Sequence, residues 1–302
     1  MSNPPPQPIL GSFTPLRGGY NQAIAPGERL VTLAMGGAAW WDGDVAVEAS
    51  LPPHVPVDGA RWTPDGKSLR VGLGTLDLAA RTWRPEPALA RFGEVGPGGE
   101  SPVRQVAWFA DAAHVAILRD EAGAQELVIA AAADGRVRGR LAVENASAMV
   151  AAEDRVLVAA RELLVVDLDG KVVARPAPVP DSVTRVDHGG GMFAAVGIGG
   201  AVALLHPADG TVLATWDDHV YDAVPVERGV VVVDGQGTVR VGCLDGGRLR
   251  QVAEAASGAA GHIVIQRVGD RIVVASGTPE PVRVATFSSP CDAAQGASRA
   301  RT

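Results

Sequence analysis

The fold of this chain is decided by residues 60–71, ARWTPDGKSLRV, and by a second copy of the same pattern at residues 106–117, VAWFADAAHVAI. Each copy contains a strand that ends at a tryptophan, a tight turn that holds an aspartate, and a second strand. The Asp65-Gly66 pair supplies the positive φ that a tight hairpin turn needs, which places this pair between strands. The two stretches therefore predict consecutive hairpins built on one plan.

The second strand of this plan recurs along the chain. In each copy a turn residue or a charged residue precedes a pair of apolar residues, and the seven copies lie at residues 28–31, 65–69, 113–116, 154–157, 191–193, 228–231 and 270–273. A period of about forty residues is typical of β-propellers, in which one repeat cannot bury its own faces and packs on its neighbours. We therefore predict an all-β fold, a seven-bladed β-propeller of four-stranded antiparallel blades.

A propeller has to be closed into a ring, because open first and last blades would expose unpaired strand edges. The last blade reads as only three strands, at residues 262–267, 271–275 and 282–287. The apolar run Ile9–Phe13 lies outside the repeat, and we expect it to form the missing outer strand of the last blade. This gives one propeller domain over residues 1–290 and a flexible C-terminal tail over residues 291–302.

The segment Trp62-Thr63-Pro64-Asp65-Gly66-Lys67 resembles the "W-S-P-D-G" turn of the WD40-like (WD40/YVTN-type) propeller family, which includes bacterial relatives with degenerate repeats. The resemblance covers residues 20–288. Two Trp-Asp dipeptides, at 41–42 and 216–217, are isolated and do not mark repeats. The resemblance implies the propeller fold and a tendency to bind proteins, and it transfers no catalytic residue to this chain.

Composition and charge narrow the classes of function. Of the 302 residues, 47% are apolar and 20% are charged, as in folded globular proteins. The net charge of −7 disfavours binding to a phosphate backbone, so nucleic acid is not an expected partner. No window approaches the eighteen or so apolar residues of a membrane span, and the first residues lack the basic and apolar regions of a signal peptide. We therefore expect a cytoplasmic location.

The chain has two cysteines, Cys243 and Cys291, which lie far apart in sequence. Cys291 falls in the polar C-terminal tail. Two cysteines make neither a disulfide framework nor a thiolate metal site. The sequence therefore predicts two reduced thiols, one packed and one exposed.

Catalytic chemistry has little support in the sequence. The six histidines share no short spacing that would bring two of them to one face of an element. The acidic residues fall mostly in Asp-Gly turns, where the backbone already accounts for them, and there is no Gly-x-Ser-x-Gly elbow. We expect no converging group of polar side chains, no metal, no cofactor and no enzymatic activity.

Aromatic residues are scarce, at 4% of the chain, which makes their positions informative. Trp62 and Trp108 occupy equivalent positions in the repeat, so packing explains them. Trp and Tyr are enriched at binding hot spots, because each offers a rigid apolar surface with a polar group. The candidate interaction residues are Trp40, Trp41, Trp83, Trp216, His219 and Tyr221.

The function that the sequence favours is a non-catalytic propeller that presents a rigid loop face to another protein. It would act as a scaffold or as an accessory subunit of a larger, bacterial complex. The alternative is a metal-dependent hydrolase of small molecules, similar to the lactonase-like propellers, that uses carboxylates around the central channel. The sequence identifies neither the partner nor the binding face.

Overall fold

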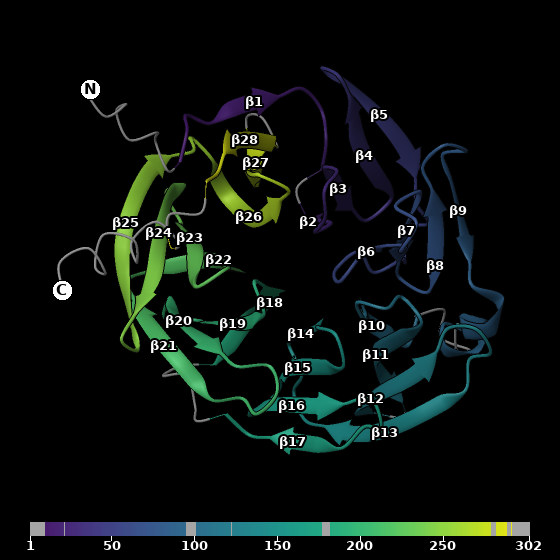
Figure 1. Cartoon of the computed structure of the whole chain (residues 1–302). Coiled ribbons are helices and arrows are strands. Elements are labelled where there is room, and N and C mark those ends of the chain that lie inside the picture. The colour runs from purple at the N-terminus through teal and green to yellow at the C-terminus, as the bar shows by residue number, and fades with distance from the viewer. Residues whose placement is uncertain are drawn as a thin grey trace, which may run out of the picture.

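Seven four-stranded sheets stand around a central channel and form a closed ring (Figure 1). The protein is represented by a computed structural model that describes residues 10–20, 22–94, 101–121, 123–176, 182–278, 282–288 and 291. Neighbouring strands in every sheet are hydrogen-bonded in antiparallel register. Among the described residues, the helical structure is one 3₁₀ segment, η1 (Pro87–Phe92). The predicted seven-bladed all-β propeller is confirmed.

The first four blades follow the chain in order, each from the strand nearest the channel to the outermost strand. Blade one holds β2 (Ala23–Ile24), β3 (Val31–Ala34), β4 (Gly37–Asp42) and β5 (Val45–Ser50). Blade two holds β6 (Arg61–Trp62), β7 (Ser68–Val71), β8 (Gly74–Asp77) and β9 (Thr82–Pro85). Blade three holds β10 (Val103–Trp108), β11 (His114–Glu121), β12 (Ala124–Ala131) and β13 (Val137–Val143). Blade four holds β14 (Ala148–Ala151), β15 (Arg155–Ala159), β16 (Leu163–Asp167) and β17 (Val172–Ala174).

The last three blades contain the longer strands. Blade five holds β18 (Val183–Gly189), β19 (Met192–Gly197), β20 (Ala201–Leu205) and β21 (Val212–Asp217). Blade six holds β22 (Val220–Val226), β23 (Gly229–Asp234), β24 (Thr238–Asp245) and β25 (Arg248–Ala256). Blade seven holds β26 (Ala260–Val268), β27 (Arg271–Thr278), β28 (Val282–Thr286) and, from the other end of the chain, β1 (Thr14–Leu16).

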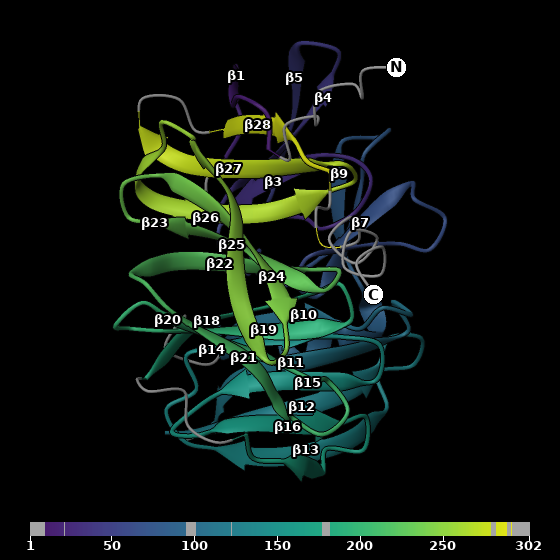
Figure 2. The same cartoon turned by 60° about the vertical axis from the view of Figure 1, so that its left-hand side comes forward.

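Strand β1 closes the ring as the outer strand of blade seven, beside β28 (Figure 2). Thr14 pairs with Val284 and Leu16 with Val282. Closure by an N-terminal strand is confirmed, but the strand begins just after the predicted run of residues 9–13. Ile9 lies outside the described residues, and Leu10 makes an isolated bridge to Phe287. Two described side chains of this run serve packing: Leu10 is buried in the core between blades six and seven, and the partly buried Phe13 packs against that core.

The apolar cores lie between neighbouring blades. One cluster joins blades one and two, another blades three and four, and others join blades four and five, five and six, six and seven, and seven and one. The core of blade three also covers Leu89 and Phe92 of η1. Each blade therefore buries its faces only against its neighbours, which is why seven repeats in a ring are stable where one would not be.

The two cysteines form a disulfide, with the sulfur atoms of Cys243 and Cys291 joined at 2.16 Å. Both residues are buried, each only 4% exposed. The prediction of two reduced thiols is therefore wrong. Spacing in sequence did not reveal the pair, because the ring fold alone brings residue 291 back to β24 of blade six. The rest of the predicted tail, residues 292–302, lies outside the described residues.

Candidate functional site

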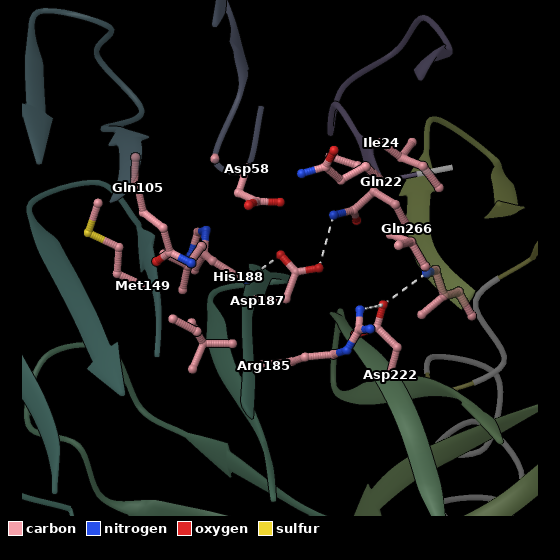
Figure 3. Close-up of a pocket in the computed structure, with 18 of the residues that line it drawn as sticks. Gln22, Ile24, Asp58, Gln105, Met149, Arg185, Asp187, His188, Asp222 and Gln266 are labelled. Atoms are coloured by element: carbon pink, nitrogen blue, oxygen red, sulfur yellow. Dashed lines mark hydrogen bonds and ion pairs between the residues drawn. The ribbon is translucent and has the colours of Figure 1, made fainter. Parts of the chain in front are cut away.

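The candidate site is the central channel, which holds a cavity of about 630 Å³. The innermost strands of all seven blades, or residues just before them, line it. Its polar side chains come from every blade: Gln22, Asp58, Arg61, Gln105, Ser147, Thr184, Arg185, Asp187, His188, Tyr221, Asp222, His262 and Gln266. Figure 3 draws 18 of the lining residues and labels ten of them. A cavity of this size lies within the range of small-molecule binding sites.

The expectation that no polar side chains converge is therefore wrong. It failed because the channel takes only one to four polar residues from each blade, so they form no recognisable sequence motif. Arg185 and Asp187 illustrate this: they are two residues apart in β18, which places them on the same side of the strand. Their neighbours in the channel come from other blades.

Asp187 is the most perturbed group in the channel. Its Oδ1 accepts a hydrogen bond from the His188 backbone N–H at 2.7 Å, and its Oδ2 accepts one from Nε2 of Gln266 at 2.9 Å. Burial raises the pKa of Asp187 to about 8, and the charge of Asp222 adds to the rise. The Asp187 carboxyl is therefore mostly protonated at neutral pH, where it can also donate a hydrogen bond.

Asp222 is held by a tighter set of partners. Its carboxylate accepts hydrogen bonds from the backbone N–H groups of Ala223 and Ile265, both at 3.0 Å, and lies 3.5 Å from Nη1 of Arg185. Burial raises the pKa of Asp222 to about 6, while Arg185 opposes the rise. At neutral pH this carboxyl is mostly ionised and is paired with Arg185.

The Arg185 guanidinium also stacks on an aromatic ring. It lies 4.8 Å from the centroid of the Tyr221 ring, and the Tyr221 hydroxyl is 3.3 Å from Nδ1 of His262. Burial lowers the pKa of His262, and the charge of Arg185 lowers it further. Arg185 is thus engaged from two sides, by a carboxylate and by a ring.

Asp58 and Arg61 face the channel from blade two with fewer partners. Water reaches Asp58 inside the channel, yet surrounding protein atoms raise the pKa of its carboxyl, with only Arg185 opposing the rise. Among the described residues, no group donates a hydrogen bond to this carboxyl. Arg61 donates to the carbonyl oxygen of Ala151 at 3.4 Å, and burial lowers the pKa of its guanidinium.

His188 lies beside Asp187, where only 9% of its side chain is exposed. Its ring packs edge-on against Phe193, with centroids 5.4 Å apart. Burial lowers the pKa of His188, so its imidazole is neutral at neutral pH. Its Nε2 makes no hydrogen bond to any described residue, although the Glu153 carboxylate lies 3.7 Å away.

The channel does not resemble a metal centre. Among the residues that the structure describes, no three His, Cys, Asp or Glu side chains come together as metal ligands. The Asp187 and Asp222 carboxyls are instead occupied by amide and guanidinium donors from the chain itself. The lactonase-like alternative is not supported. The cavity is instead lined by hydrogen-bond donors and acceptors, which include both cationic and anionic side chains.

Four of the six predicted interaction residues are tryptophans that pack within or between blades. Trp40 and Trp216 are only 7% and 8% exposed. Trp216 lies so close to Gly242 that no side chain could replace that glycine without a clash. The half-buried Trp41 and Trp83 donate from their Nε1 atoms to the carbonyl oxygens of Arg17 at 3.1 Å and Val71 at 3.0 Å.

The remaining two predicted residues lie near the channel. His219 is exposed in the connection from β21 to β22, where its φ is 45°. Tyr221 lines the cavity and stacks with Arg185. The structure therefore does not bring the six residues together, and only Tyr221 belongs to the channel. The sequence signal that could have revealed the channel site is the presence of polar residues within the innermost strands, such as Arg185 and Asp187 in β18.

Comparisons with known proteins identify the fold. No protein-family model and no curated protein sequence matches the chain. The WD40 repeats of RRP9 superpose with a TM-score of 0.67 at 11% identity, over 92% of this chain and 99% of that chain. The Cps50 (Swd1) propeller of Myceliophteria thermophila gives a TM-score of 0.67 at 11% identity, over 92% and 100%. A chain of the Mitotic Checkpoint Complex gives 0.67 at 10% identity, over 96% and 98%.

These similarities show that the chain has the seven-bladed β-propeller fold that WD40 repeat domains also adopt, as the resemblance at residues 62–67 predicted. At such low identity they establish the fold and no function. Within the part of the chain that the structure describes, no helix is long and apolar enough to cross a membrane.

Proposed function

We propose that this chain is a non-catalytic interaction propeller, a scaffold or accessory subunit that binds another protein through the face of the ring on which the channel opens beside Ile198. The observation that carries the proposal is a pair of exposed apolar side chains on that face. Met35 is 67% exposed and Ile198 is 75% exposed. Exposed methionine and isoleucine side chains around a rigid opening are typical of protein-binding surfaces.

The two residues share a face because of the strand order. Met35 lies in the turn between β3 and β4, and Ile198 in the turn between β19 and β20. These are the second-to-third-strand turns of blades one and five. The first strands of all blades run in the same direction along the channel, and the strands of each blade alternate in direction. The turns between second and third strands therefore all lie on one face of the ring, and the connections from one blade to the next lie on the same face. We call this the connector face.

The connector face is also joined to the channel. The Met35 backbone N–H donates to Oε1 of Gln22 at 3.0 Å, and both Gln22 and Ile198 line the cavity. A partner seated on Met35 and Ile198 would therefore cover the opening. The Mitotic Checkpoint Complex chain shows the same fold inside an assembly, which supports a role of this kind for the present chain.

The test compares the two faces of the ring. Val45 is 68% exposed but follows the turn between β4 and β5, which places it on the opposite face. Native co-purification with quantitative mass spectrometry should recover one partner with wild type and with the control Val45→Glu. The double variant Met35→Glu, Ile198→Glu should lose it. Equal recovery by all three proteins, or no partner with wild type, would refute the proposal.

The cellular compartment is a separate matter. The cytoplasmic location stays a prediction from the sequence, and the Cys243–Cys291 disulfide counts against it, because such bonds persist mainly in oxidising compartments. Alkylation of the protein's free thiols directly in lysed cells distinguishes a reducing compartment from an oxidising one. Two labelled thiols would favour a reducing compartment, and an intact disulfide an oxidising one.

A further inference from the structure

The channel contains polar groups to which no described residue is hydrogen-bonded. No described residue donates to the Asp58 carboxyl, and Oε1 of Gln105 is buried without a hydrogen-bond partner. Nε2 of the largely buried, neutral His188 is likewise free of hydrogen bonds to described residues. Buried polar atoms are nearly always paired in folded proteins. Two such buried atoms line the cavity together with Asp58, an exposed carboxyl to which no described residue donates, and this combination indicates a ligand that supplies hydrogen-bond donors.

The two arginines of the channel do not supply the missing hydrogen-bond partners. Arg185 is held between the Asp222 carboxylate and the Tyr221 ring. Arg61 donates to the carbonyl oxygen of Ala151, at the end of β14, and the carboxylates of Glu153 and Asp111, outside the cavity, favour the charged form of its guanidinium. Surrounding protein atoms raise the pKa of Asp58, and only the charge of Arg185 opposes that rise.

Two carboxyls share the open centre of the cavity. Figure 3 shows Asp58, from blade two, and Asp187, from blade five, directed into the same space. A group that carries a positive charge and several N–H donors could bond to Asp58 and to Oε1 of Gln105, which lines the same cavity. Ammonium and guanidinium groups have these properties, and their bonds to carboxylates are about twice as strong as neutral hydrogen bonds.

We propose that the central channel binds an organic cation, with its ammonium or guanidinium group on Asp58 and its apolar part along the channel wall. The cavity of about 630 Å³ can hold such a molecule. The chemistry fits a free amine or guanidine and equally the basic side chain of a bound protein. This inference stands on the channel alone and does not require the proposed partner on the connector face.

Isothermal titration tests the charge requirement with a matched pair of ligands. n-Butylguanidinium carries the positive charge, and n-butylurea has nearly the same shape without it. We expect saturable one-to-one binding of butylguanidinium to the wild-type protein and no measurable binding of butylurea. Equal binding of the two ligands, or no binding of butylguanidinium, would overturn the proposal.

Variants locate the site. Asp58→Asn keeps the shape of the side chain and should weaken butylguanidinium binding about tenfold or more, the effect of losing one charge-assisted hydrogen bond. Water reaches Asp58 and the chain supplies it no donor, so the variant should fold, which its thermal melt checks. Asp42→Asn is the control, since Asp42 is exposed and away from the cavity. Unchanged affinity in a folded Asp58→Asn variant would contradict the assignment.

A peptide ligand distinguishes the two possible sources of the cation, a basic side chain of another protein and a free small molecule. A blocked peptide with a single arginine between glycines is titrated beside butylguanidinium, with its citrulline analogue as the neutral control. Tighter binding of the arginine peptide identifies a protein side chain as the ligand, and tighter binding of butylguanidinium identifies a small molecule. Met35→Glu, Ile198→Glu should leave butylguanidinium affinity within about twofold, so a failure of the interaction face and a failure of the channel site can be told apart.

Discussion

The cores between the blades and the central channel are built from the same strands by opposite means. In blade five, Phe193 of β19 is fully buried in the core shared with blade four, and its ring touches His188, which lines the channel. One residue before His188, Asp187 carries a buried carboxyl whose pKa is raised to about 8. The cores gain stability from burial of apolar surface, whereas the channel loses stability by desolvating charge.

This difference indicates that the functional site lies in the channel. Sites that break the usual rules of burial at a cost in stability are commonly binding or catalytic sites. The predictions below separate the two regions by the size and the sign of their effects on the free energy of unfolding.

The largest effect is expected in a core between blades. Phe193→Ala removes a fully buried ring between blades four and five and should lower the free energy of unfolding by about 3–5 kcal/mol. Urea unfolding followed by far-UV circular dichroism measures the loss. A change below about 1 kcal/mol would mean that this core does not hold the ring together.

The disulfide should rank second. Cys291→Ser opens a bond that joins residues 48 apart in sequence, which should cost about 2–4 kcal/mol. Urea unfolding with and without reductant provides the check: reductant should destabilise wild type and leave the variant unchanged. If reductant has no effect on wild type, the two sulfurs are not bonded in the protein.

The channel should give an effect of opposite sign that depends on pH. Burial raises the pKa of Asp187 from 3.8 to about 8, so its protonation favours the folded state. That contribution is complete below about pH 4 and is lost as the pH rises to 8. Asparagine does not titrate, so Asp187→Asn should gain stability relative to wild type steadily from pH 4 to 8, and no further above pH 8.

Urea unfolding at several pH values measures this gain. Asp65→Asn is the control, because the Thr63 hydroxyl and the Lys67 backbone N–H hold the pKa of Asp65 below its usual value. Asp65 is therefore ionised in both the folded and the unfolded protein above about pH 5, and its variant should show no trend between pH 5 and 8. A flat difference for Asp187→Asn would show that the channel is as well solvated as the surface.

The smallest effect is expected at the surface ion pairs. Nε of Arg104 lies 2.6 Å from the Asp120 carboxylate, but the two side chains are 57% and 31% exposed. Arg104→Ala should change the free energy of unfolding by less than about 1 kcal/mol, as measured by urea unfolding. A larger loss would mean that surface charge helps to hold the ring, which would weaken the contrast between cores and channel.

The sequence predicted the ring because its signals are local. The Asp65-Gly66 pair indicates a tight turn from two adjacent residues alone. The apolar second strands recur about every forty residues, and this period can be read without knowing which blades lie side by side. The closing strand was predicted in the right place in the fold but a few residues too early. Leu10 of the predicted run is buried in the core and makes only an isolated bridge to Phe287, and the continuous pairing with β28 begins at Thr14.

The channel and the disulfide could not be read in the same way, because both depend on the closed ring. Asp58 precedes a first strand of only two residues, and Asp187 and Asp222 lie in different blades with no shared spacing. Which side of each first strand faces the axis is set only when all seven blades meet. Cys243 and Cys291 become neighbours for the same reason, through the return of the chain past blade six.

The most direct test of this contrast is the titration of Asp187 itself, followed by the ¹³C chemical shift of its carboxyl group in the wild-type protein. The structure predicts a midpoint near pH 8, far above that of Asp65 in the same spectrum. A midpoint close to the ordinary value of 3.8 would show an open, water-filled channel, and would contradict the view that this ring keeps an unsatisfied polar site at its centre.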